Sequence, residues 1–176
     1  MKFLQLFLLV LALFTLSQCK KDNAAPQLPP ETTTGANKVG CRVNGQVLVP
    51  RSKGRTEGLQ FGFINRANGR IPMFFLAFVD AEVSPFRSVM LEVDSLVLRE
   101  GQTYPFRTPG GRHQASHFDG KQDYIKRDQD QGELTITRLD SVQRILSGRF
   151  HFVGTDRNSG QQVQVTEGRF DLRYSQ

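Results

Sequence analysis

Apolar and polar residues alternate along most of the chain after residue 39. The alternation is clearest in the segments 134–137, 146–152 and 162–166, where every second residue is apolar or glycine. A period of two is typical of β-strands that bury one face. Apolar residues do not recur at helical spacing outside the N-terminal segment. The pattern therefore predicts a single all-β domain over residues 39–176.

Turn residues separate these segments at intervals of about 10 residues, as in antiparallel sheets. Asn44 and Gly45 lie between two short β-prone runs, which is a strong hairpin signal because both residues tolerate positive φ. A second hairpin loop is expected over 156–160. We predict an antiparallel two-sheet sandwich. A partly closed β-barrel is the alternative, because alternation does not reveal whether a sheet closes.

Three segments depart from simple alternation. The run 71–79 is apolar at both odd-numbered and even-numbered positions. Its strand is therefore expected at the centre of the core with both faces covered. Gly168 stands where the parity of the last strand resets and is the expected left-handed bulge residue, with Asp171 outward beyond it. Residues 107–131 hold few aliphatic side chains, so we expect a long loop with at most one short strand near 124–125.

The N-terminal segment has a different pattern. Residues 3–16 are almost wholly apolar, but this run is too short for a membrane-spanning helix, which needs about 20 residues. It fits the apolar part of a signal peptide over 1–18. The segment ends with Leu16, Ser17, Gln18 and Cys19. These four residues resemble the lipobox of bacterial lipoproteins, although Gln18 stands where a small residue is usual. The resemblance implies that Cys19 is acylated and anchors the protein to a membrane without spanning it.

The residues after Cys19 read as a tether. The segment 19–38 contains three prolines, three consecutive threonines and no periodic apolar pattern, a composition typical of extended linkers. Near its start, Lys21 and Asp22 resemble the export signal of surface lipoproteins in some two-membrane bacteria. We predict a lipid-anchored flexible tether over 19–38 and a location in the cell envelope, at the outer membrane. The side of the membrane is left open.

Composition and charge narrow the range of partners. The 176 residues include 23 Lys and Arg against 17 Asp and Glu, a net charge of +6. The basic residues are dispersed and most have an acidic neighbour, so no nucleic-acid partner is expected. Weak attraction to anionic lipid or polysaccharide is compatible with the excess. With 14 Phe, a chain of this length can form a core without disulfides or metals.

Two polar clusters are candidates for metal ligation. His113, His117 and Asp119 offer two imidazoles and a carboxylate. Their spacing brings both histidines together only on a helix, which the upstream Pro and Gly residues disfavour. Asp128 and Asp130 resemble part of a calcium loop, but Leu replaces the acid that an EF-hand needs at its twelfth position. We interpret the histidine cluster as part of a solvated loop, and Asp128 and Asp130 as the polar start of a hairpin. We therefore predict no metal or cofactor.

Sequence signals of catalysis are few. The chain has no nucleophile elbow, phosphate-binding loop or dinucleotide fingerprint. Cys41 lies in a predicted strand without a neighbouring His, so we expect a small buried residue with an unpaired thiol. Carboxylates such as Glu92 and Asp171 would be needed as a close pair in glycoside hydrolysis, but both fall on outward strand positions. We predict a non-enzymatic protein, with a secreted or envelope hydrolase as the alternative.

Four motifs give the chain a family resemblance. They are Gly40-Cys41-Arg42-Val43-Asn44-Gly45, Gly101-x-x-Tyr104, Ser147-Gly148-Arg149-Phe150-x-Phe152 and Val165-Thr166-x-Gly168-Arg169-Phe170-Asp171. Together they resemble a family of uncharacterised bacterial envelope lipoproteins, across nearly the whole chain after the signal segment. The resemblance implies a lipid-anchored β domain and brings no catalytic residue or ligand with it.

These observations predict a lipid-anchored envelope module that presents loops to a glycan, a peptide or another envelope protein. The segment 107–131 is the main candidate for such a loop. A structural subunit of an envelope assembly is a further alternative. Convergent polar side chains in a deep cleft would favour the hydrolase, whereas a broad exposed apolar patch would favour the structural subunit.

Overall fold

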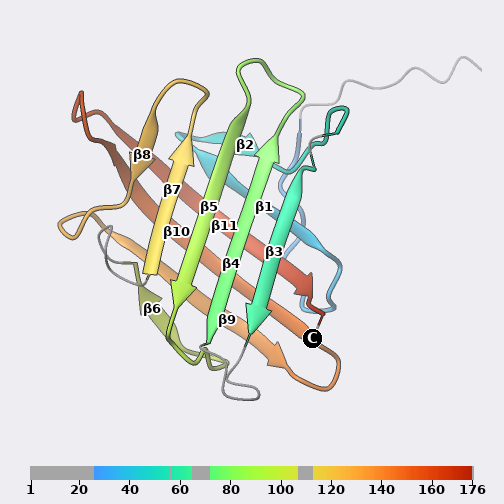
Figure 1. The fold of residues 1–176 in the computed structure, drawn as a ribbon. Helices are drawn as coiled ribbons and strands as arrows, with labels where there is room; N and C mark the ends of the chain where they lie inside the picture. The colour runs from blue at the N-terminus through green and yellow to red at the C-terminus, as the bar shows by residue number, and fades with distance from the viewer. Residues whose placement is uncertain (1–25, 56, 65–71, 107–112, 176) are drawn as a thin grey trace, which may run out of the picture.

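The described chain consists of β-strands and connecting segments. The computed structural model describes residues 26–55, 57–64, 72–106 and 113–175. The strands (Figure 1) are β1 (Lys38–Val43), β2 (Gln46–Leu48), β3 (Leu59–Ile64), β4 (Met73–Asp80), β5 (Arg87–Asp94), β6 (Thr103–Pro105), β7 (His113–Phe118), β8 (Asp123–Ile125), β9 (Gly132–Asp140), β10 (Ile145–Asp156) and β11 (Gln162–Arg173). In this part of the chain, no helix is long and apolar enough to cross a membrane.

The strands form two layers that face each other across the core, as Figure 1 shows. The front layer contains β3, β4, β5 and β7, and the back layer contains β2, β1, β11, β10, β9 and β6. β8 pairs with both β7 and β10, so one antiparallel sheet folds over at β8. Over the described residues, the end strands β2 and β3 do not pair with each other, and the sheet is not closed. The predicted antiparallel sandwich is confirmed, and the sheet does not form the alternative barrel.

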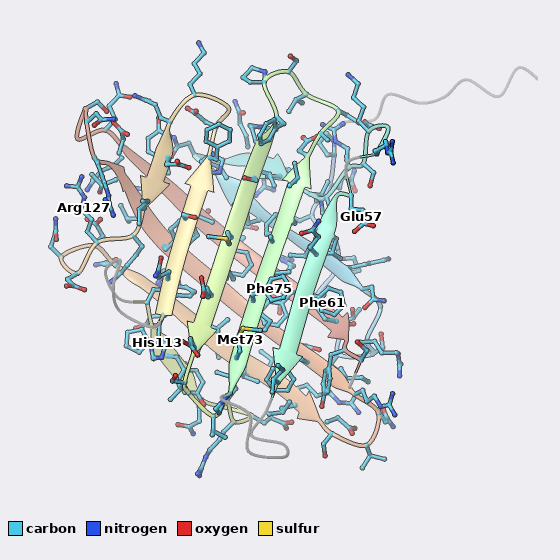
Figure 2. The ribbon with its side chains drawn as sticks, viewed as in Figure 1. Glu57, Phe61, Met73, Phe75, His113 and Arg127 are labelled. Atoms are coloured by element: carbon cyan, nitrogen blue, oxygen red, sulfur yellow. The ribbon has the colours of Figure 1, made fainter. Side chains whose placement is uncertain are left out.

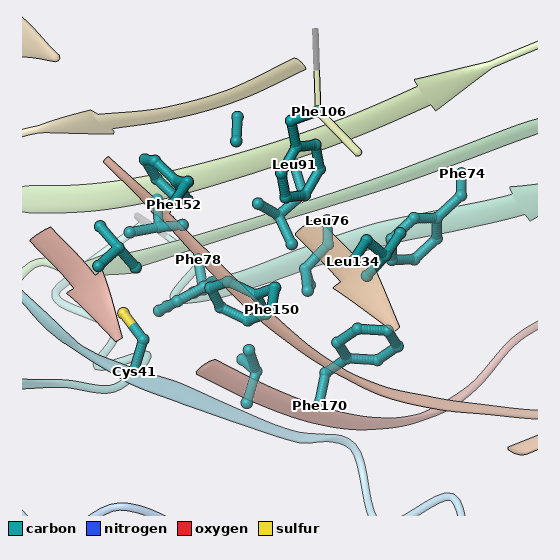
Figure 3. Close-up of a cluster of buried hydrophobic side chains, with 14 of the residues drawn as sticks. Cys41, Phe74, Leu76, Phe78, Leu91, Phe106, Leu134, Phe150, Phe152 and Phe170 are labelled. Atoms are coloured by element: carbon teal, nitrogen blue, oxygen red, sulfur yellow. The ribbon is translucent and has the colours of Figure 1, made fainter. Parts of the chain in front are cut away.

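Phenylalanine side chains from both layers fill the space between them (Figure 3). Phe74 of β4 packs against Phe170 of β11 at a ring-centroid distance of 5.5 Å, and Phe78 packs against Phe150 at 6.3 Å. Each fully buried side chain of this size contributes about 1.5–3 kcal/mol through the hydrophobic effect. Among the described residues, all buried members of the core lie within 39–172. A chain that begins at residue 20 therefore retains all of them and every described contact.

Glycines face phenylalanines across the β10–β11 pair. Gly148 lies opposite Phe170, and Gly168 lies opposite Phe150. A Cβ atom on either glycine would lie 2.5 Å from the facing ring. The positive φ near this bulge, 51°, belongs to Glu167. The prediction that Gly168 is the left-handed bulge residue is therefore wrong, because its role is to leave space for the Phe150 ring.

β4 is apolar on both faces but buries only one of them. Phe74, Leu76 and Phe78 point between the layers and are buried. The outward residues remain partly exposed, and they are Met73, Phe75, Ala77 and Val79. The prediction of a strand covered on both faces is wrong. The apolar pattern places residues on the two faces of a strand, but it does not show whether another layer covers each face.

The segment predicted as a long loop contains two strands. β7 and β8 occupy much of its described part, and β7 pairs with β5 on one side and β8 on the other. β7 buries Ala115 and His117. The long-loop prediction is wrong because a polar side chain can lie inward when it finds a hydrogen-bond partner. Residues 107–112 of the predicted loop lie outside the described residues.

Residues 26–37, which we call the strap, lie against the outer face of the back layer. They form no strand and lead directly into β1. Their approach to the sheet is close, since a Cβ atom at Gly40 would lie 2.9 Å from Pro29. The sequence predicts a flexible tether as far as Lys38. The contacts of the strap instead make the described part of that tether a portion of the folded domain.

Candidate functional site

One buried carboxylate, that of Asp171 in β11, holds the strap. Asp171 is 2% exposed, and its two oxygens accept six hydrogen bonds with donor–acceptor distances of 2.6 to 3.2 Å. The donors are the backbone N–H groups of Thr34, Gly35 and Ala36 and the hydroxyl groups of Thr32, Thr34 and Ser147. The carboxylate therefore links the strap to two neighbouring strands, β10 and β11.

Asp171 points away from the core, as the alternation predicts, but it is not solvent-exposed because the strap covers it. Burial by itself would raise the pKa of Asp171. The side-chain hydrogen bonds from Thr32 and Ser147 and the N–H groups of Gly35 and Ala36 outweigh burial and hold that pKa well below its ordinary value. The carboxylate is therefore charged at neutral pH with both oxygens engaged. This arrangement suits a structural clamp better than a partner in glycoside hydrolysis.

Three cationic side chains line a cavity of about 150 Å³ between the strap and the back layer. They are Lys38 of β1, Arg149 of β10 and Arg169 of β11. Arg149 and Arg169 lie directly opposite each other in the strand register. Arg149 donates through Nε and Nη2 to one oxygen of Glu31 in the strap, at 2.9 and 2.6 Å. Arg169 Nη2 lies 3.4 Å from Glu167 Oε2.

A second buried carboxylate, that of Asp80, lies at the end of β4. Arg51 donates to both of its oxygens at 2.9 and 2.6 Å, and Arg87 lies 3.4 Å away. Burial raises the pKa of Asp80, but the hydrogen bonds and charge of Arg51 prevail and lower it. No site was predicted here from the sequence, although the sequence contains a signal for this cluster. Asp80 points to the same side of β4 as the inward residue Phe78. Arg87 likewise points to the same side of β5 as the inward residue Val89.

The candidate metal ligands His113, His117 and Asp119 do not form a site. His113 and His117 are four residues apart on β7, which separates them by about 13 Å at roughly 3.3 Å per residue. Two imidazoles that far apart cannot share an ion whose ligands lie about 2 Å away. Asp119 instead accepts hydrogen bonds from the N–H groups of Lys121 and Gln122, at 2.8 and 2.9 Å. It thereby stabilises the turn after β7.

His117 is buried, so the interpretation of this segment as a solvated loop is wrong. Its Nδ1–H donates to the Ser88 carbonyl at 2.8 Å, and its ring stacks on Tyr124 at a centroid distance of 6.0 Å. Burial lowers the pKa of His117, and the hydrogen bond to Ser88 and the charge of Asp119 only partly offset this effect. The neutral imidazole therefore connects β5, β7 and β8.

The candidate calcium ligands Asp128 and Asp130 lie in turns. Asp130 Oδ2 accepts hydrogen bonds from the Thr155 hydroxyl at 2.9 Å and the Arg127 N–H at 3.1 Å, and its Oδ1 accepts one from Gln162 Nε2 at 3.3 Å. Asp128 lies in the exposed turn before β9. Within the described ranges, no three His, Cys, Asp or Glu side chains gather into a metal-binding group.

Cys41 is buried in β1 with a free thiol, as predicted. Burial raises the pKa of Cys41 to about 12 despite the nearby charge of Arg87, so the thiol is not a nucleophile at neutral pH. Glu92 lies on the outer side of β5, also as predicted. The lipobox lies outside the described residues, and it comprises Leu16, Ser17, Gln18 and Cys19.

The outer side of the front layer carries adjacent apolar residues that we call the apolar face. They are Ile64, Met73, Phe75, Ala77, Val79 and Met90, all partly exposed, with Met90 at 44%. Figure 2 shows Met73 and Phe75 on this layer. Glu92 and Asp94 lie directly opposite Phe75 and Met73. The sequence signal for this face was the run 71–79, which is apolar at both odd-numbered and even-numbered positions.

The four buried groups described above serve structural contacts. Asp80 and Asp171 are held by several donors, His117 by a backbone carbonyl, and Cys41 by apolar packing. Comparisons with protein-family models, with curated proteins and with solved structures gave no match.

Proposed function

We propose that the chain is a lipid-anchored, non-enzymatic module of the bacterial envelope that binds another envelope protein through its apolar face. The outer side of the front layer, which the described residues leave partly exposed, carries this proposal. Met73, Phe75 and Met90 are partly exposed there, whereas the strap crosses the outer side of the back layer. Contiguous exposed apolar residues are unfavourable in water and mark interaction surfaces.

The chemistry of the apolar face favours a protein partner over a glycan. Its side chains are aliphatic, thioether and phenyl groups, which make dispersion contacts but offer few hydrogen bonds. Glu92 and Asp94 add negative charge beside Phe75 and Met73. The complementary partner surface is an apolar patch bordered by Lys or Arg. A permanent partner would make the module a structural subunit of an envelope assembly.

The buried polar groups support binding over the hydrolase alternative. General acid–base and nucleophilic catalysis need side chains within hydrogen-bond distance of the substrate. The carboxylates of Asp80 and Asp171 are instead occupied by structural donors, and the raised pKa of Cys41 keeps its thiol protonated. The apolar face also supports a contact surface made of strands, in place of the loop 107–131 expected from sequence.

Photo-crosslinking in the producing bacterium tests the apolar face. A photoreactive residue at Ala77 is expected to give one discrete protein adduct. Met90→Glu is expected to lower its yield about tenfold, which corresponds to roughly 1.4 kcal/mol of lost affinity. Val142→Glu is the matched control, because Val142 is 90% exposed and lies outside the face. Equal losses with both variants, or no discrete adduct, would refute the proposal.

The lipid anchor has its own test. Cys19→Ala is expected to move the protein from the detergent phase to the aqueous phase, because its acyl chains supply the membrane affinity. Leu16→Val, which keeps an aliphatic side chain in the lipobox, serves as the control and is expected to leave partitioning unchanged. Membrane association of Cys19→Ala equal to that of the unaltered chain would contradict acylation at this residue.

A further inference from the structure

The cavity beneath the strap gathers cations from three neighbouring strands. Lys38, Arg169 and Arg149 come from β1, β11 and β10 and line the same cavity. Arg149 and Arg169 are directly opposite in register, and like charges in that position destabilise an antiparallel pair. An anion next to both guanidinium groups removes this penalty.

Glu31 supplies an anion from within the chain. Only its Oε2 atom accepts the two hydrogen bonds from Arg149. The side chains of Arg149 and Glu31 are 61% and 44% exposed, and exposed ion pairs add little to stability. Glu31 also belongs to the strap, which has no strand pairing. A ligand with stronger charge can therefore replace this carboxylate without disturbing the core.

The remaining charges leave the cavity positive. Glu167 lies 2.9 Å from Arg42 and 3.4 Å from Arg169, so it is shared between two cations. No ion pair joins Lys38 to an acidic residue in the described part of the chain. Asp171 also lines the cavity, but both of its oxygens accept hydrogen bonds from the strap and Ser147. Once Glu31 moves away, three cations face this one engaged carboxylate.

We propose that this cavity is a binding site for a phosphate group, and that Glu31 occupies it in the absence of ligand. Arg149 and Arg169 would donate from adjacent strands, and Lys38 would contribute the third charge. Phosphate carries a larger charge than a carboxylate and offers three terminal acceptor oxygens, one for each cation. The cavity of about 150 Å³ admits a small group of this kind. The site lies on the opposite outer face from the apolar face, so it does not depend on the proposed function.

Calorimetric titration of the chain 20–176 with inorganic phosphate tests the site. Arg149→Gln is expected to weaken binding about tenfold, and Glu31→Gln to strengthen it about threefold to tenfold, in line with the loss or gain of one close charge. Lys38→Gln is a second weakening variant at an independent position. Arg157→Gln is the matched control, because Arg157 is exposed in the β10–β11 loop. It removes the same charge and is expected to change affinity less than about twofold.

Vesicles distinguish the two sources of a phosphate group. Binding to phosphatidylcholine vesicles that contain phosphatidic acid, but not to phosphatidylcholine alone, would assign the site to a lipid headgroup. Binding to inorganic phosphate without vesicle binding would assign it to a soluble phosphorylated ligand. Either result supports the site, provided that Arg149→Gln and Lys38→Gln weaken binding and Arg157→Gln does not. Absence of binding to both probes overturns it, as does equal weakening by Arg149→Gln and Arg157→Gln. Failure of Glu31→Gln to strengthen binding overturns the role of Glu31.

Discussion

Replacing the carboxylate of Asp171 removes the main hydrogen-bond acceptor that holds the strap. Asp171→Asn keeps the size of the side chain but leaves one oxygen in place of two. Its amide also places N–H donors where the strap and Ser147 already donate. We expect the strap to detach from the back layer while the core remains folded, because all buried core residues lie within 39–172.

The size of this effect follows from the contacts of the carboxylate. Hydrogen bonds to a charged group contribute about 1.5–3 kcal/mol each when measured singly, but the six that Asp171 accepts share one side chain and are not additive. Detachment also lets the freed N–H groups reach water, which limits the cost. We expect a loss of about 3 kcal/mol in the free energy of unfolding. This loss corresponds to roughly 6–12 °C in Tm for a domain of this size.

Urea unfolding and limited proteolysis measure the two consequences separately. A Glu-specific protease is expected to cleave after Glu31 at least about tenfold faster in Asp171→Asn, because proteolysis follows the population of the open segment. Asp123→Asn is the matched control, since Asp123 is exposed on β8 and the substitution removes the same charge. If Asp171→Asn were as stable and as resistant to the protease as Asp123→Asn, the carboxylate would not hold the strap.

The pH dependence gives an independent check on Asp171. Its pKa is lower in the folded state than in the unfolded state. The carboxylate therefore stabilises the fold fully above the unfolded value of about 3.9, and this contribution is lost as pH falls through the folded value. The difference in stability between the unaltered chain and Asp171→Asn is expected to be constant from about pH 7 to 5 and to narrow below about pH 4. A difference that grew on acidification would have the wrong sign.

Three further substitutions or measurements concern the buried residues. The lowered pKa of His117 means that the unaltered chain loses stability as pH falls through the unfolded value of about 6.5. His117→Asn keeps an N–H donor for the Ser88 carbonyl. In urea titrations, this variant is expected to lose less stability than the unaltered chain between about pH 7 and 5. The thiol of Cys41 is expected to react with a thiol reagent at least about a thousandfold faster in urea than in the folded chain 20–176. Gly168→Ala is expected to cost about 2–3 kcal/mol, because its Cβ would lie 2.5 Å from the Phe150 ring.

Each of these expectations has a contradicting result. An equally steep acid loss in His117→Asn would show that this imidazole does not cause the pH dependence. Rapid labelling of Cys41 without denaturant would mean that β1 opens easily or that the thiol is accessible. A Gly168→Ala variant as stable as the unaltered chain would show that the Phe150 ring can shift without cost.

Features determined by neighbouring residues were predictable from the sequence. Asn44 and Gly45 adopt positive φ values of 47° and 81° between β1 and β2, as the hairpin signal indicates. Gly160 has a φ of 73° in the predicted loop over 156–160. The alternation also identified the inward residues of β10 and β11. A turn and a strand face depend on a few adjacent residues, so composition and period suffice to predict them.

Coverage of a strand's outer side depends on segments far apart in the chain. Asp171 and Phe75 both point outward from their strands, yet Asp171 is buried beneath the strap, whereas the described residues leave Phe75 partly exposed on the front layer. The strap has no apolar period, because a single extended segment that crosses a sheet does not bury one regular face. Its Thr residues and N–H groups bind Asp171 from more than 130 positions away in sequence. No local pattern encodes that pairing.

The polar strand β7 shows a second limit of sequence patterns. Ala115 is small and His117 is ionisable, so the inward side of this strand has no large apolar residue to mark its period. His117 is nevertheless buried because the Ser88 carbonyl accepts its Nδ1–H. For the same reason, the two histidines on β7 were interpreted as part of a solvated loop. Their spacing has chemical meaning on a helix, whereas a strand separates residues four positions apart.

The docked strap changes how an anchored domain would sit at a membrane. A tether from Cys19 to Lys38 could extend about 65–70 Å, but the link from Cys19 to Pro26 can extend at most about 25 Å. That reach is shorter than the diameter of a domain of this size, about 40 Å. If Cys19 carries lipid, this short link keeps the start of the strap within about 25 Å of the headgroups. The proposed phosphate site beneath the strap would then be close to the bilayer, whereas the apolar face lies on the opposite outer face of the domain.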